Sequence, residues 1–145
     1  MRKLGLDVGD KTIGVAVSDE LDITAQGVTT IDRVGIRKDA GTVMDYVREY
    51  DCDTVVMGLP INLDGSDSVQ TEKVREFRTM LENKMRSSGM ADVKVEWQDE
   101  RFTTVIAERV LMEANMKRKS RKEVVDKQAA IIILQSYMDR VKNGK

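Results

Sequence analysis

Two runs of apolar and β-branched residues near the N-terminus, Leu4–Val8 and Ile13–Ser18, constrain the fold more than any other feature of the sequence. Only residues 9–12 lie between them, and a connection this short joins two strands in antiparallel orientation. A third run with strand character, Gln26–Ile31, follows. The sequence therefore predicts a sheet that begins with three antiparallel strands.

Helical and strand patterns alternate after this unit. Apolar residues recur at steps of three and four over Gly35–Tyr50, which predicts a helix. The continuous apolar run Thr54–Met57 is typical of a strand covered on both faces. Further along, we expect a helix capped by Ser66 or Ser68 and ending near Arg86, a strand at Val93–Trp97, a helix from Thr103 or Thr104 to about Asn115, a basic connector over Lys117–Lys122, and a last helix from about Glu123 to Val141.

This order predicts an α/β protein. Its mixed sheet should have an antiparallel three-strand start followed by parallel strands, with helices on both faces. The 145 residues are a suitable length for one domain, so we expect a single domain over 1–145. No apolar run is long enough to span a membrane, and the N-terminus does not resemble a signal peptide, so we expect a cytoplasmic protein without a membrane partner.

Composition excludes several chemistries. The sequence has no histidine and one cysteine, Cys52, so histidine catalysis, an internal disulfide and a cysteine-cluster zinc site are ruled out. Cys52 precedes an apolar strand and is expected in the core. Hydrolytic chemistry would then use carboxylates, lysines, hydroxyls or a metal, and oxygen ligands favour Mg²⁺ or Mn²⁺. The net charge of −1 gives no support for nucleic-acid binding, which must rest on a local patch.

Two acidic residues stand where strands are expected to end. Asp7 interrupts the first apolar strand, and burying an unpaired carboxylate costs several kcal/mol unless a partner or a metal compensates. An aspartate that stabilises a hairpin turn is the alternative. Glu100 follows the strand ending at Trp97, and ligand sites of α/β sheets gather at such carboxyl ends. A solvated acidic loop in which Asp99 or Glu100 pairs with Arg101 is the alternative there.

A third acid, Asp126, falls in the last predicted helix. Its spacing places it on one face with Ala130, Ile133 and Tyr137, which is the apolar side of the helix. Asp126 could instead be a helix-start residue that interacts with the helix dipole. Asp7, Glu100 and Asp126 together would suit two divalent cations about 4 Å apart, which activate water and stabilise the leaving oxygen in phosphodiester hydrolysis.

Phosphate-binding candidates surround these acids. Residues 58–66 connect a strand to a helix, where backbone amides and the side chains of Asn62 and Ser66 could hold a phosphate. The basic run before Asp126 could guide the nucleic-acid backbone, although a solvated connector is a common alternative. The full set of expected nucleic-acid contacts is Lys11, Thr12, Asn62, Ser66, Arg101, Thr103, Lys117, Arg118, Lys119, Arg121 and Lys122.

Four ordered segments resemble the YqgF family, whose members are described as pre-16S ribosomal RNA nucleases or Holliday junction resolvases. The segments are Leu4–Asp19, Val56–Ser66, Asp99–Thr104 and Lys122–Tyr137. The resemblance implies a ribonuclease H-like fold, a bacterial cytoplasmic protein, and catalytic acids at Asp7, Glu100 and Asp126. Where the family commonly has arginine or serine, this chain has Thr12, which keeps a hydroxyl but lacks a cation.

We therefore expect a nuclease dependent on Mg²⁺ or Mn²⁺, acting on structured nucleic acid and processing the 5′ end of pre-16S ribosomal RNA. A resolvase of branched DNA would use the same site and would need a homodimer, so monomer and homodimer both stay open. Asp7 and Gly9 with Gly14 also resemble the phosphate-binding hairpin of actin-like ATPases, but this chain is too short for their two domains. A non-catalytic nucleic-acid-binding module is the remaining alternative.

Overall fold

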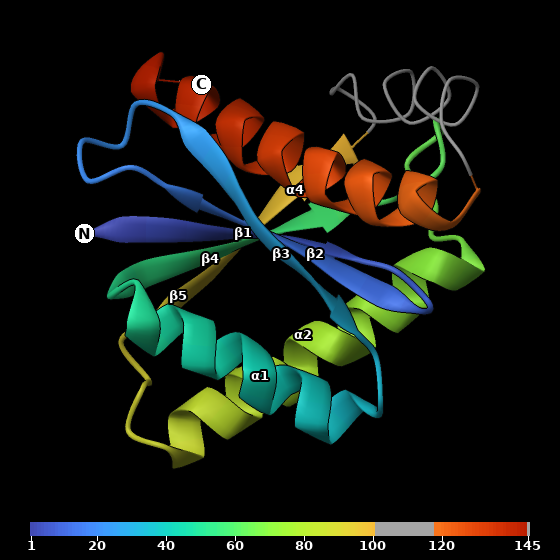
Figure 1. The fold of residues 1–145 in the computed structure, drawn as a ribbon, viewed down its shortest axis with the longest axis horizontal. Coiled ribbons are helices and arrows are strands. Elements are labelled where there is room, and N and C mark those ends of the chain that lie inside the picture. The colour runs from blue at the N-terminus through green and yellow to red at the C-terminus, as the bar shows by residue number, and fades with distance from the viewer. Residues whose placement is uncertain (101–117, 145) are drawn as a thin grey trace.

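The computed structural model describes residues 1–100 and 118–144, with side chains described for 1–100 and 127–144 (Figure 1). The strands are β1 (Arg2–Val8), β2 (Thr12–Ser18), β3 (Ala25–Asp32), β4 (Cys52–Leu59) and β5 (Lys94–Asp99). The described helices are α1 (Ile36–Glu49), α2 (Val69–Ser87) and α4 (Arg118–Lys142). None of these helices is long and apolar enough to cross a membrane.

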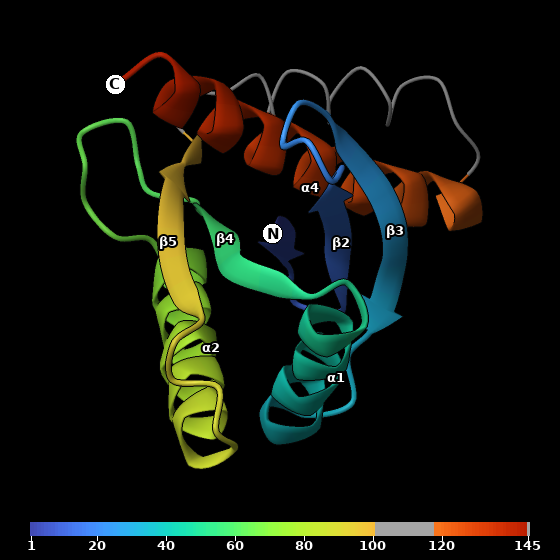
Figure 2. The ribbon, with the colours of Figure 1, turned by 90° about the vertical axis from the view of Figure 1, so that its left-hand side faces the viewer.

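The strands form one mixed sheet in the order β3-β2-β1-β4-β5. β1 and β3 pair with β2 in antiparallel orientation, whereas β4 runs parallel to both β1 and β5. Figure 2 shows α4 on one side of this sheet and α1 and α2 on the other. The predicted mixed sheet with helices on both faces is therefore confirmed. Because β1, β4 and β5 are parallel, their carboxyl ends meet at one edge.

Each face of the sheet has its own apolar core, because successive strand side chains point to opposite faces. On the α1 and α2 face, Leu4 and Leu6 of β1 pack with Phe77 and Leu81 of α2, and all four are fully buried. On the other face the core is smaller and belongs to α4. Its buried members are Ala16, Val56, Ala129, Ala130, Ile133, Leu134, Tyr137 and Met138.

Small residues allow α4 to lie close to the sheet. A Cβ atom at Gly5 of β1 would lie 2.7 Å from Cβ of Leu134 and 3.0 Å from the carbonyl oxygen of Ala130. Ala129 and Ala130 are almost fully buried against the sheet. The alanine pair thus permits a close approach of α4 to the sheet, and Gly5 is required for it.

The structure corrects the prediction for the basic run. The chain is helical from Arg118, so Arg118, Lys119, Arg121 and Lys122 belong to the first turns of α4 and do not form a connector. Lysine and arginine are good helix formers, and neither glycine nor proline interrupts the segment. The helix therefore begins before its first apolar residue, Val124. The helix predicted from Thr103 or Thr104 to Asn115 lies outside the described residues, as do Arg101 and Lys117.

Substituting Gly5 with alanine should destabilise the fold by about 1–3 kcal/mol, because the new methyl group would collide with the backbone and Cβ of α4. Gly41→Ala is the matched control. Gly41 lies inside α1, where the nearest atom to an added Cβ is the flexible Lys84 Nζ at 3.4 Å. That change should stabilise the protein by about 0.5–1 kcal/mol. Urea unfolding of both variants checks the prediction, and equal stabilities would contradict it.

Candidate metal and nucleic-acid site

Asp7 is the second-last residue of β1, and its side chain is only 7% exposed. Gly5, two residues earlier, faces α4. Because strand side chains alternate, Asp7 faces the α4 side as well. The apolar strand therefore carries its carboxylate to the edge of the sheet where the parallel strands end.

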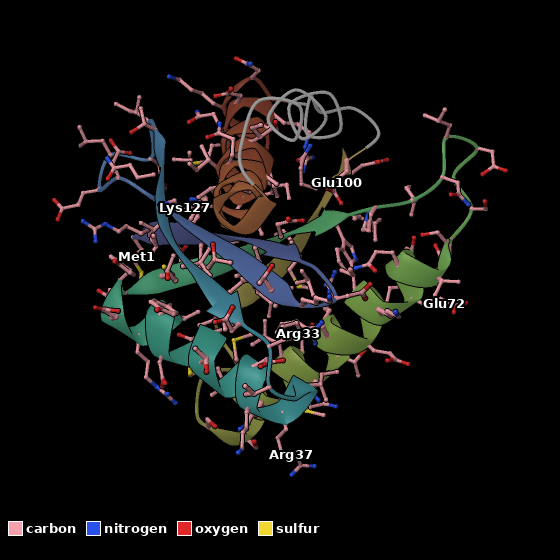
Figure 3. All side chains as sticks on the ribbon, turned by 45° about the vertical axis from the view of Figure 1, so that its right-hand side comes forward. Met1, Arg33, Arg37, Glu72, Glu100 and Lys127 are labelled. Atoms are coloured by element: carbon pink, nitrogen blue, oxygen red, sulfur yellow. The ribbon has the colours of Figure 1, made fainter. Side chains whose placement is uncertain are left out.

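Glu100 follows β5 directly and is also 7% exposed. Its carboxyl carbon lies 3.1 Å from the position that a Cβ atom would occupy at Gly58 of β4. Gly58 pairs with Gln98 of β5 and comes one residue after the Leu6–Met57 pair between β1 and β4. Glu100 thus lies over the strand that separates it from Asp7, at the sheet edge where β4 and β5 end (Figure 3).

Glycines occupy the neighbouring strands beside Asp7. Gly14 is its partner on β2, and Gly58 is the next position on β4 after the partner of Leu6. Neither residue has a side chain that could fill the space next to the carboxylate. The two buried acids carry carboxylate oxygens, which are the ligands that a hard divalent cation prefers. Sequence reasoning missed Gly58, because a glycine before Leu-Pro indicates a loop and not the end of a strand.

Asp126 is placed by the backbone of α4 alone, since its side chain lies outside the described residues. Ala130, one turn later, contacts Gly5, whereas Met138 lines a surface pocket with Lys3. The helix therefore runs opposite to β1, and its earlier turns lie toward the end that carries Asp7. Within the described side chains no cluster of three metal-ligating residues occurs, so the convergence of three acids stays a prediction.

The start of α4 at Arg118 changes one interpretation of Asp126. The helix begins two turns before Asp126, and the influence of the helix dipole on a carboxylate falls off within the first turn. The dipole interaction considered as the alternative role of Asp126 is therefore not favoured.

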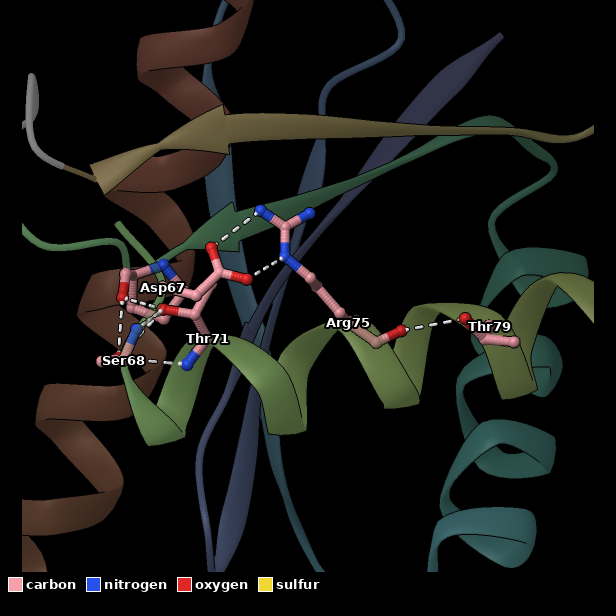
Figure 4. Close-up of polar contacts among 6 residues, drawn as sticks. Asp67, Ser68, Thr71, Arg75 and Thr79 are labelled. Atoms are coloured by element: carbon pink, nitrogen blue, oxygen red, sulfur yellow. Dashed lines mark hydrogen bonds and ion pairs between the residues drawn. The ribbon is translucent and has the colours of Figure 1, made fainter. Parts of the chain in front are cut away.

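The loop between β4 and α2 bonds mainly to itself. Asn62 Nδ2 donates to Ser66 Oγ at 3.0 Å, and Ser66 Oγ donates to the carboxylate of Asp64 at 2.6 Å. The α2 N-terminus is closed by a capping box, in which Ser68 Oγ accepts from the Thr71 amide (Figure 4). The structure brings Asn62 and Ser66 together as expected, but their donors are directed at loop acceptors, so direct phosphate binding here is not favoured.

The turn between β1 and β2 places Lys11 and Thr12 differently. Lys11 is exposed beside the site, whereas Thr12 is 7% exposed at the start of β2, so a phosphate contact suits the lysine better than the hydroxyl. Two side chains from elsewhere hold this turn: Gln70 Nε2 donates to the Val8 carbonyl, and Arg33 Nη1 donates to the Gly9 carbonyl. No spacing signal in the sequence indicated these long-range bonds.

A family model described as RuvX, Holliday junction resolvase, matches residues 1–140. The chain belongs to the RuvX family. A protein from Clostridium tetani named "Putative pre-16S rRNA nuclease" is 48% identical over 143 residues, covering 99% of both chains. A protein of the same name from Clostridium novyi is 45% identical over 141 residues, covering 97% of this chain and all of the relative.

Solved structures show the same fold for this RuvX-family chain. RuvC of Thermus thermophilus, in complex with a Holliday junction substrate, aligns with a TM-score of 0.60 and 13% identity, covering 99% of this chain and 97% of RuvC. The fowlpox virus Holliday junction resolvase aligns with a TM-score of 0.54 and 14% identity, covering 96% and 99%. At these identities the likeness establishes the ribonuclease H-like fold alone.

The thiol of this RuvX-family protein is unsuited to catalysis. Cys52 opens β4 with 4% of its surface exposed, and burial raises the pKa of its thiol to about 12. The expected core position is confirmed. The thiolate is the nucleophilic form, so a thiol held protonated at neutral pH does not serve as the nucleophile.

A thiol-specific reagent at pH 8 should therefore leave Cys52 unmodified in the folded protein and modify it fully in denaturant. Absorbance of the released chromophore measures both states. Rapid modification of the native protein would show that the thiol is accessible and would contradict the prediction.

Replacing Gly58 with alanine should impair the site, because the added Cβ would lie 2.6 Å from Ile133 Cδ1 and 3.1 Å from the Glu100 carboxyl carbon. A shift of about 1 Å in a reacting group can lower activity about a hundredfold. We expect a loss of nucleic-acid cleavage and weaker Mn²⁺ binding, measured by turnover and by calorimetric titration. Gly41→Ala is again the control. Unchanged Mn²⁺ binding in Gly58→Ala would contradict the prediction that the space over Gly58 belongs to the site.

Proposed function

We propose that this protein is a divalent-metal-dependent nuclease that hydrolyses phosphodiester bonds, with Asp7, Glu100 and Asp126 as its metal ligands. The observation that carries the proposal is the pair of buried carboxylates, Asp7 and Glu100, which lie on one face beside the side-chain-free Gly58. We expect Asp126 to join them, because α4 runs opposite to β1 and its earlier turns lie toward the end of β1 that carries Asp7.

The chemistry of the donors fits Mg²⁺ or Mn²⁺. The sequence has no histidine, and the two described acids offer hard carboxylate oxygens. Divalent cations at such a site lower the pKa of water and neutralise the charge that develops on the phosphate. The ends of β1 and β5 hold the two acids in place on opposite sides of β4. Asp7 and Glu100 would therefore orient the bound cations.

The favoured substrate is a precursor of 16S ribosomal RNA, because the relatives at 45–48% identity carry that activity in their names. We propose that Lys11 and the basic first turns of α4, from Arg118 to Lys122, attract the phosphate backbone toward the acids. Charge contacts of this kind position a nucleic acid without selecting its sequence.

A branched-DNA substrate is the second candidate, favoured by the description of the matching family model. Symmetric cleavage of a four-way junction requires two active sites related by a twofold axis. A resolvase would therefore be a homodimer under cleavage conditions, whereas a ribonuclease could act as a monomer. Sedimentation at working concentration distinguishes the two states.

The decisive test uses Asp7→Asn, Glu100→Gln and Asp126→Asn, assayed with Mg²⁺ or Mn²⁺ on pre-16S RNA, single-stranded RNA and four-way DNA. Each substitution should lower cleavage by more than about a hundredfold, because partners one shell further from a metal already contribute ten- to a hundredfold. Chelation with EDTA should abolish cleavage by the wild type.

Asp10→Asn is the matched control, since Asp10 is an exposed acid in the turn after β1 and pairs with Lys73. It should retain cleavage. Persistent cleavage in all three site variants, with circular dichroism showing an intact fold, would rule out the mechanism. Binding without turnover in any metal would identify a non-catalytic module.

A further inference from the structure

The turn that follows Asp7 accepts hydrogen bonds from two side chains outside the β1–β2 hairpin, on the side of the sheet covered by α1 and α2. The hairpin closes with its own bond from the Gly9 amide to the Thr12 carbonyl, at 2.9 Å. In addition, Gln70 of α2 donates to the Val8 carbonyl at 3.1 Å, and Arg33 donates to the Gly9 carbonyl at 2.8 Å. The carbonyls of the two residues after Asp7 thus each accept a bond from another part of the fold.

Arg33 is itself held in one orientation. Its Nε lies 3.0 Å from the carboxylate of Asp39, an α1 residue that is 1% exposed. The other oxygen of Asp39 accepts a bond from the Val34 amide. The guanidinium of Arg33 lies over the Phe77 ring, with its Cζ 5.4 Å from the ring centroid. The rigid fork of arginine lets Nε bind Asp39 while Nη1 points at the Gly9 carbonyl, a geometry that lysine does not reproduce.

The bonds from Arg33 and Gln70 lie at the end of β1, past the point where its pairing with β4 stops. The ladder between β1 and β4 ends at the Leu6–Met57 pair, whereas the ladder with β2 continues through Asp7–Gly14 and Val8–Ile13. At Asp7 the strand is therefore held by its sheet partner on one side. The bonds from Arg33 and Gln70 supply a second restraint, from the face of the sheet opposite to α4.

We propose that Arg33, oriented by Asp39, and Gln70 are positioning residues for Asp7, and that they fix its carboxylate for metal binding through the backbone of Val8 and Gly9. This inference rests on the proposed function, in which Asp7 is a metal ligand. A buried ion pair is often no more stabilising than apolar residues of the same volume, which favours a geometric role for this one. Functional groups need placement within about 0.5 Å, so loss of either bond should weaken the site.

The test compares Arg33→Lys and Gln70→Met with the wild type. Arg33→Lys keeps the positive charge beside Asp39 but loses the fork, and Gln70→Met removes the donor at similar volume without burying a charge. For each we expect about a tenfold weaker affinity for Mn²⁺ alone by calorimetry, a smaller Tm increase on adding Mn²⁺, and a kcat about ten- to a hundredfold lower with KM for the nucleic acid unchanged.

Arg75→Gln is the matched control. Arg75 of α2 is likewise ion-paired, but its Nε and Nη2 lie 2.9 and 3.1 Å from the carboxylate of Asp67, in the loop before α2 (Figure 4). It should match the wild type in Mn²⁺ affinity and in kcat.

Asp7→Asn separates the two proposals. If this variant binds Mn²⁺ as the wild type does, the proposed function fails. If it loses Mn²⁺ while Arg33→Lys and Gln70→Met retain full affinity and kcat, only the positioning inference is overturned. A purely structural role would lower the metal-free Tm and leave metal affinity unchanged, which also overturns it. Should Arg33→Lys fail to fold, Gln70→Met alone decides the question.

Discussion

The contact between α4 and a row of glycines on the sheet determines the geometry of the whole α4 face. Gly27 of β3, Gly5 of β1 and Gly58 of β4 each come so close to α4 that an added Cβ would lie within 3.0 Å of an α4 atom. One helix thus crosses the three strands at positions where the strands carry no side chain, and side chains of α4 such as Lys127 and Ile133 fill the space over Gly27 and Gly58. This contact holds the backbone of α4 against the sheet, and the direction of α4 opposite to β1 points its earlier turns toward the end of β1 that carries Asp7.

The extent to which the sequence predicted this arrangement depends on the range of the interactions involved. The hairpin of β1 and β2 follows from local patterning, and so does the parallel continuation through β4. Asp7 and Glu100 could be selected because each acid disturbs a local pattern. The role of Gly58 could not, because its contacts with Glu100 and Ile133 come from segments far along the chain. The early start of α4 was missed because polar helix formers carry no periodic apolar signal.

The two faces of the sheet have different parts in the proposed site. The α4 face carries the buried acids and the glycines beside them. The opposite face carries the apolar core of α1 and α2, together with the bond from Arg33 to the turn after Asp7. The helix-covered core is therefore connected to the strand end that carries Asp7 by hydrogen bonds to two backbone carbonyls, those of Val8 and Gly9.

The buried acids in the described part of the chain illustrate two ways of accommodating a carboxylate. Asp39 lies within α1, where the Arg33 guanidinium and the Val34 amide satisfy its two oxygens. That geometry is complete within the fold and serves to aim the arginine. Asp7 and Glu100 instead come from the ends of β1 and β5, on either side of β4, and the Glu100 carboxyl group lies against Gly58. Acids that come from different elements keep a fixed separation only if the fold holds those elements rigidly. For this reason we connect the Arg33–Asp39 ion pair, which orients Arg33 toward the turn after Asp7, with the proposed metal site.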